Sequence, residues 1–133
     1  MITGGEPMLN PQRTIGIIKD LKRLYPKAKI FMYTALYDKA IYDIIPLVDG
    51  IQYTIHEGAD WAEVTGLALF QEAIKSLDAH KTKSFRMYVY PKVDVELTIL
   101  PHLWKRVEVK AWLEEGECDL PEGETLYIIR QRD

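Results

Sequence analysis

The stretch Thr3-Gly4-Gly5-Glu6-Pro7 decides the fold of this chain, because it has the composition of a tight turn between two regular elements. The short apolar start Met1-Ile2 precedes it, and Asn10-Pro11 opens a helical pattern after it. Two adjacent glycines let the backbone adopt positive φ and leave no Cβ in the way of a ligand. Pro7 fixes φ and stiffens the exit from the turn. We therefore expect the turn at the carboxyl end of a strand, where open α/β sheets place their ligands.

The chain beyond the turn alternates between helical and strand patterns. Three runs rich in β-forming residues predict buried strands, over residues 29–34, 51–55 and 84–90. Helical patterns lie between these strands, over residues 11–25, over residues 38–45 and after Asp60, which with Glu63 resembles a capping box. This alternation predicts an α/β fold whose parallel strands are joined by right-handed crossovers.

The pattern changes after Pro91. Three weaker strand patterns follow, over residues 95–100, 107–112 and 125–130. Residues 114–124 are acidic and contain glycine and proline, which is typical of a solvated loop. We expect a core over residues 1–91 and a short β-rich extension of the same domain over residues 92–133.

The segment Gly4-Gly5-Glu6-Pro7 resembles the GGEP motif of radical S-adenosylmethionine (radical SAM) enzymes. In that family the motif follows the second strand of a partial (β/α) barrel, and its backbone and acid hold the amino group of the methionine moiety. The resemblance covers residues 1–90, of which the opening motif is the specific part. It implies a barrel-like parallel sheet and an S-adenosylmethionine site at Gly4, Gly5, Glu6 and Pro7. It also implies reductive cleavage of that cofactor to a 5′-deoxyadenosyl radical in the full-length family.

The chain departs from the family in its cysteines. Family members carry a CxxxCxxC loop after the first strand, and three thiolates of that loop hold a 4Fe–4S cluster. This chain has a single cysteine, Cys118, and begins at what would be the second strand. We therefore expect a truncated form that is inactive alone, with a cluster only if the cysteine loop is supplied from elsewhere. A gene start placed too far downstream, a degenerate remnant or a split protein would each give such a chain.

A missing first strand has a consequence for association. Ile2 would then lie on an open sheet edge with unpaired backbone groups, which are prone to pair with another chain. The sequence therefore predicts self-association or a partner chain along the Ile2 edge.

Polar residues of the predicted strands form a second candidate set. Because side chains alternate along a strand, those of like parity share one face of the sheet. We expect a polar cavity lined by Gln52, Thr54, His56, Arg86 and Tyr88, which Thr34 at a strand end would join. We expect three of these residues, Thr34, His56 and Arg86, to take part in binding the cofactor.

Three charged or titratable residues have competing interpretations. His56 suits hydrogen bonding or proton transfer, and the alternative is an exposed residue at a strand end. Arg86 in an apolar strand needs an anionic partner or water, because burial of a lone cation is costly. Its partner would be a cofactor carboxylate, a substrate acid or Glu57. Glu6 is interpreted as an acceptor for a cationic amine, and the alternative is a solvated turn residue.

Size and composition narrow the class of protein. The chain has 133 residues, of which 47% are hydrophobic and 28% charged, as in an ordinary globular domain. The net charge of −3 without a basic block does not point to nucleic acid. The sequence shows no signal peptide and no apolar run long enough to span a bilayer, so no membrane association is expected. A single cysteine fits a reducing compartment, and we expect a cytoplasmic protein.

Other functions stay open at this point. The three histidines, His56, His80 and His102, do not share the spacing of metal ligands, so no metal site is predicted. The alternative to a radical SAM core is a non-catalytic α/β module whose glycine turn binds a phosphate or small anion at a helix start. Glu6 opposes that alternative, because a carboxylate repels an anion. A structural or interaction protein that uses the acidic tail is a third option.

Overall fold

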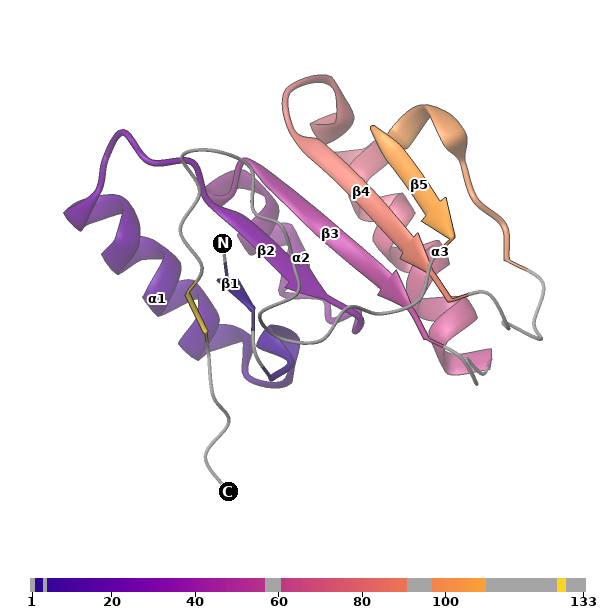
Figure 1. Cartoon of the computed structure of the whole chain (residues 1–133), viewed down its shortest axis with the longest axis horizontal. Coiled ribbons are helices and arrows are strands. Elements are labelled where there is room, and N and C mark those ends of the chain that lie inside the picture. The colour runs from indigo at the N-terminus through magenta and orange to yellow at the C-terminus, as the bar shows by residue number, and fades with distance from the viewer. Residues whose placement is uncertain (1, 4, 57–60, 91–96, 110–126, 129–133) are drawn as a thin grey trace.

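The computed structural model describes residues 2–3, 5–56, 61–90, 97–109 and 127–128. Its strands form one sheet in the order β5-β4-β3-β2-β1-β6, and every neighbouring pair is parallel (Figure 1). The strands are β1 (Ile2–Thr3), β2 (Phe31–Thr34), β3 (Gly50–Ile55), β4 (Ser84–Val89), β5 (Arg106–Val109) and β6 (Tyr127–Ile128). The expected α/β class, a parallel sheet whose strands alternate with helices, is confirmed.

The helices connect consecutive strands. They are α1 (Pro11–Leu24), α2 (Ile41–Ile44) and α3 (Trp61–Ser76), with short 3-10 turns at Pro7–Leu9, Ile45–Leu47, Ala79–Lys81 and Pro101–Leu103. Helix α1 begins where the sequence predicts, because the Asn10 side chain accepts a hydrogen bond from the Arg13 N–H at 3.2 Å and Pro11 is the first helical residue. Among the described residues, no helix is long and apolar enough to cross a bilayer.

The two faces of the sheet differ in chemistry. One face carries large apolar side chains, among them Met32, Ile51, Tyr53, Phe85 and Met87, each no more than 2% exposed. They belong to one core cluster with buried side chains of α1, α2 and α3, and Figure 1 shows α2 and α3 behind the sheet. The Phe70 ring of α3 lies 4.7 Å from the Tyr53 ring and 6.2 Å from the Phe85 ring, measured between centroids. The opposite face carries the polar residues of the strands.

The connection between β4 and β5 corrects one expectation. Residues 97–100 are not a strand, although the sequence predicts one over residues 95–100, of which 95 and 96 lie outside the described residues. The buried Gln71 of α3 binds this segment instead. Its amide donates to the Thr98 carbonyl at 2.9 Å, and its Oε1 accepts from Leu100 N–H at 2.9 Å and from Trp104 Nε1 at 3.0 Å. These side-chain bonds satisfy backbone groups that a strand would have paired with a neighbour.

The edge at β1 corrects another expectation. Ile2 is in register with Met32 on one side and with Tyr127 on the other, because β6 pairs with β1 in parallel. The prediction of an open edge at Ile2 is therefore wrong. Strands β5 and β6 both join the sheet built by the first part of the chain, while self-association and a partner chain stay predictions.

Candidate functional site at the carboxyl edge of the sheet

The glycine turn lies directly after β1, as the sequence predicts. Gly5 adopts a φ of 61°, in the left-handed region that favours glycine. Glu6 follows in extended conformation and caps the 3-10 turn Pro7–Leu9, because its Oε2 accepts a hydrogen bond from Met8 N–H at 2.8 Å. Gly4 lies outside the described residues, so the structure places only the second glycine of the pair.

The Glu6 carboxylate also reaches the neighbouring strand. Its Oε1 accepts from Ala35 N–H at 2.6 Å, and the Thr34 hydroxyl lies 2.7 Å from Oε2 and 2.9 Å from Oε1. A hydroxyl carries one proton, so Thr34 donates to one oxygen at a time. Glu6 therefore ties the turn after β1 to the carboxyl end of β2, and Thr34 lies beside it.

The carboxylate retains some binding capacity. Two carboxylate oxygens offer about four lone-pair positions. Among the described residues, the donors at Glu6 are Met8 N–H, Ala35 N–H and the Thr34 hydroxyl, which fill three of these positions. Glu6 is half-buried, so part of this residue is accessible at the rim of the sheet. The arrangement suits a single cationic N–H donor.

Pro7 has a structural role in the turn. It is buried, has no N–H to offer, and its carbonyl accepts a hydrogen bond of 2.7 Å from the Thr14 hydroxyl of α1. The backbone oxygen of Pro7 is therefore engaged within the fold. Pro7 directly follows Glu6, so this bond to Thr14 fixes the turn against α1.

Tyr53 lies in the same region, and the sequence did not single it out. It is 1% exposed, and burial raises the pKa of its phenol, with the negative charges of Glu6 and then Glu63 raising that pKa further. Tyr53 therefore stays a neutral phenol in a region of negative potential. The sequence pattern indicates only that Tyr53 lies on the strand face opposite to Gln52. Glu63 is interpreted from the sequence as part of a helix cap. Asp60, the other half of that cap, lies outside the described residues.

His56 follows β3 on this carboxyl edge. Its ring lies 5.4 Å from the ring of Tyr90, which follows β4, with an interplanar angle of 42°. The Tyr90 N–H donates to the Ile55 carbonyl at 3.0 Å, which holds the ends of the two strands together. His56 is thus half-buried beside an aromatic ring, rather than a fully exposed residue at a strand end.

The polar residues of β3 and β4 form a separate group. Gln52 and Arg86 are in register, and so are Thr54 and Tyr88, all on the face opposite the helices. Thr34 belongs to the other face, because it is in register with the core residue Tyr53. The structure therefore does not bring Arg86 to Glu6, and the single polar cavity expected from the sequence divides into two groups. Glu57, one candidate partner of Arg86, lies outside the described residues.

Comparison of the chain with protein-family models, curated proteins and solved structures finds no match. In the part of the chain that the structure describes, no group of three or more His, Cys, Asp or Glu side chains could hold a metal ion. Cys118 lies outside that part. The resemblance to radical SAM enzymes therefore stays a prediction that depends on the turn and its setting.

Proposed function

We propose that this chain binds S-adenosylmethionine at the carboxyl edge of its parallel sheet, as a radical SAM-type core. The observation that carries the proposal is the Glu6 carboxylate at the carboxyl edge of the sheet. Donors from the turn and from the end of β2 orient it, and those of the described residues fill three of its roughly four lone-pair positions. An ammonium group is a compact cation with several N–H donors. The amino group of the methionine moiety would donate to Glu6, while Gly5 lets the ligand approach the backbone.

The charge around Glu6 agrees in sign with this proposal. The charges of Glu6 and Glu63 both act on Tyr53, so the potential there is negative and favours a ligand that carries an ammonium and a sulfonium. His56 and Tyr90 follow β3 and β4 at the same edge, with their rings 5.4 Å apart. By the alternation of side chains they share the face of Gln52 and Arg86, opposite to Thr34. His56 and Arg86 are therefore both left out of this proposal.

The iron–sulfur cluster of the family does not fit this chain. A cluster of this kind needs three thiolates from the protein, and the sequence contains one cysteine. The proposal is therefore limited to cofactor binding, and the chemistry of cleavage belongs to whatever supplies the cluster.

The binding proposal has a direct test by isothermal titration calorimetry. S-adenosylmethionine is expected to bind. 5′-Methylthioadenosine keeps the nucleoside and a neutral sulfur but lacks the sulfonium charge, the ammonium and the carboxylate, and is expected to bind at least about tenfold more weakly. ATP serves as an anionic control. Equal affinity for the first two ligands would remove the role of Glu6 in recognising the amine, and tighter binding of ATP would favour an anion-binding module.

The chain alone is expected to be catalytically silent. Incubation under anaerobic conditions with S-adenosylmethionine, iron, sulfide and a strong reductant should release no 5′-deoxyadenosine above the level of a Glu6→Ala control, because one cysteine cannot hold the cluster. Liquid chromatography with mass detection gives the product directly. Turnover above the control would contradict the expectation and would mean that the cluster is held in another way.

A second candidate function has one observation in its favour. The hydrogen bonds of Glu6 to Met8, Thr34 and Ala35 explain this acid as a structural clamp without any ligand. In that case the chain is a non-catalytic α/β binding or interaction module. It would show no preference for S-adenosylmethionine over other nucleotides in the same calorimetric comparison.

A further inference from the structure

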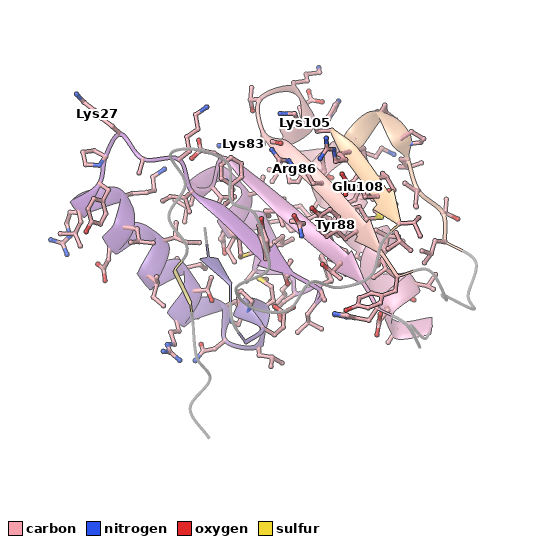
Figure 2. The ribbon with its side chains drawn as sticks, in the orientation of Figure 1. Lys27, Lys83, Arg86, Tyr88, Lys105 and Glu108 are labelled. Atoms are coloured by element: carbon pink, nitrogen blue, oxygen red, sulfur yellow. The ribbon has the colours of Figure 1, made fainter. Side chains whose placement is uncertain are left out.

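A small pocket lies on the polar face of the sheet, away from the Glu6 rim. It is lined by Phe31, Tyr33, Ile51, Gln52, Ser84 and Arg86. Phe31 and Ser84 are the first residues of β2 and β4, so the pocket belongs to the amino-terminal half of the strands. Figure 2 shows Arg86 on the sheet with Tyr88 and Glu108. The pocket is thus on the opposite face from the Thr34–Glu6 contact.

Arg86 brings a positive charge to this pocket. The side chain is half-buried, and its Cζ lies 6.0 Å from the centroid of the Phe31 ring. Within the described ranges, no carboxylate lies within 4.0 Å of its guanidinium. Its register partner on β5 is another cation, Arg106, which is itself paired with Glu108 at 2.8 Å. Among the described residues, the Arg86 charge therefore has an aromatic ring beside it and no carboxylate in ion-pair contact.

Ser84 supplies a hydrogen-bonding group beside that charge. Its Oγ is buried and has no hydrogen-bond partner in the described part of the chain. Buried polar groups nearly always have a partner, and an exception calls for an explanation such as a bound ion or ligand. Ser84 and Arg86 are two residues apart on one strand, so they face the same side of the sheet.

Two lysines increase the positive potential at this end of the sheet. Lys83 directly precedes β4, and Lys105 directly precedes β5, with its backbone N–H donating to the Phe85 carbonyl at 2.7 Å. Lys83 Nζ donates to the Pro46 carbonyl oxygen at 3.5 Å, and no described carboxylate forms an ion pair with it. At this end of the described strands the cations Lys83, Lys105, Arg86 and Arg106 outnumber the acids Asp49 and Glu108, although the whole chain has a net charge of −3.

We propose that this pocket binds the oxyanion group of a small ligand, either a phosphate or a carboxylate. The Arg86 guanidinium can donate two parallel N–H bonds to such a group, and the Ser84 hydroxyl can donate a third bond. The pocket has room for about one water-sized group, so one oxygen of the oxyanion enters it and the remainder of the ligand lies at its mouth. This site is separate from the Glu6 rim, and its existence does not depend on S-adenosylmethionine binding.

The test uses two-dimensional amide NMR of the whole chain, titrated at constant ionic strength with sodium phosphate in one series and sodium benzoate in another. Shifts are expected for the amides of Ser84 and Arg86 with at least one of the two anions. The anion that binds more tightly identifies the ligand class as phosphate or carboxylate. Absence of saturable shifts with both anions at tens of millimolar would overturn the proposal.

Matched variants separate the pocket from general charge. Arg86→Gln should weaken anion binding at least about tenfold, because the guanidinium fork is lost. Lys27→Gln removes the same charge from an exposed residue that Figure 2 shows far from Arg86, and should change the dissociation constant less than about twofold. Equal weakening by both variants would show diffuse attraction and would refute a built site.

Ser84→Ala keeps the test informative if Arg86→Gln fails to fold. It removes a buried hydroxyl that has no partner in the described residues, so the ligand-free protein should melt at the same or a higher temperature. The same variant should weaken anion binding about threefold or more, because one donor is lost. A variant that binds the anion as tightly as the wild type would contradict the role of Ser84.

Discussion

Gly50→Ala is expected to destabilise the protein strongly, whereas Gly16→Ala should stabilise it. A Cβ at Gly50 would collide with the carbonyl oxygen of Ser84 and lie 2.9 Å from two carbons of the Phe31 ring. The oxygen belongs to the backbone of the neighbouring strand, so no rotamer change relieves the contact, and β3 and β4 must move apart. We expect a loss of about 2–4 kcal/mol in the free energy of unfolding, as for other overpacked cores.

Gly16 provides the matched control for this substitution. It lies on an exposed position of α1, and a Cβ there would meet nothing within 4 Å. Replacing a helical glycine by alanine reduces the entropy of the unfolded chain, so Gly16→Ala should add about 0.5–1 kcal/mol. Urea denaturation followed by circular dichroism measures both variants. Equal stability of Gly50→Ala and wild type would show that β3 and β4 do not approach as closely as the structure places them.

Gly50 also matters for the pocket on the polar face. It is in register with Phe31 on one side and Ser84 on the other, and both of these residues line the pocket. A residue without a side chain between them therefore lets the aromatic ring and the serine share one depression.

Glu6→Ala is expected to lower both stability and affinity for S-adenosylmethionine. The substitution leaves Met8 N–H, Ala35 N–H and the Thr34 hydroxyl without their acceptor. Because Glu6 is half-buried and water can replace part of this bonding, we expect a loss of about 2–3 kcal/mol in the free energy of unfolding. Calorimetry should show at least about a tenfold weaker affinity for S-adenosylmethionine, because a charge-assisted bond to the ammonium is lost.

Two further variants separate the clamp from the binding role. Glu72→Ala removes an exposed acid whose ion pair with Lys75 is long, 4.0 Å, and should change stability by less than about 0.5 kcal/mol. Thr34→Val removes one donor but leaves the carboxylate, so stability should fall by about 1 kcal/mol while the affinity for S-adenosylmethionine stays within a fewfold of wild type. A Glu6→Ala protein as stable as the wild type would refute the clamp. If Glu6→Ala lowers the stability but leaves the affinity for S-adenosylmethionine unchanged, the binding role of Glu6 is refuted.

The order of elements was predictable from local patterns. Alternating runs of β-forming residues and helical stripes predicted β2, β3 and β4 to within two residues at each end, together with α1 and the parallel arrangement. The turn at Gly5 was predictable because a positive φ is a property that glycine brings to any context. Parity along a strand also placed Gln52 and Arg86 on one face correctly.

The partners of these residues were not predictable. Nothing in the sequence near Glu6 indicates that Thr34 and Ala35, 28 and 29 residues later, donate to its carboxylate. The burial of Gln71 against residues 98–104 likewise joins segments 27 to 33 residues apart. Such contacts depend on how the helices pack against the sheet, which local propensity does not encode.

The sequence by itself determined the α/β class, the place of the glycine turn after a strand and the division of strand residues between two faces. These properties follow from backbone conformational preferences and from the alternation of side chains, which act over a few residues. Only the tertiary structure decided that β6 pairs with β1, that Glu6 is clamped by β2, and that Arg86 lies across the sheet from Glu6. Each of these depends on the order and register of strands that are distant in sequence, because burial of a shared core selects the register.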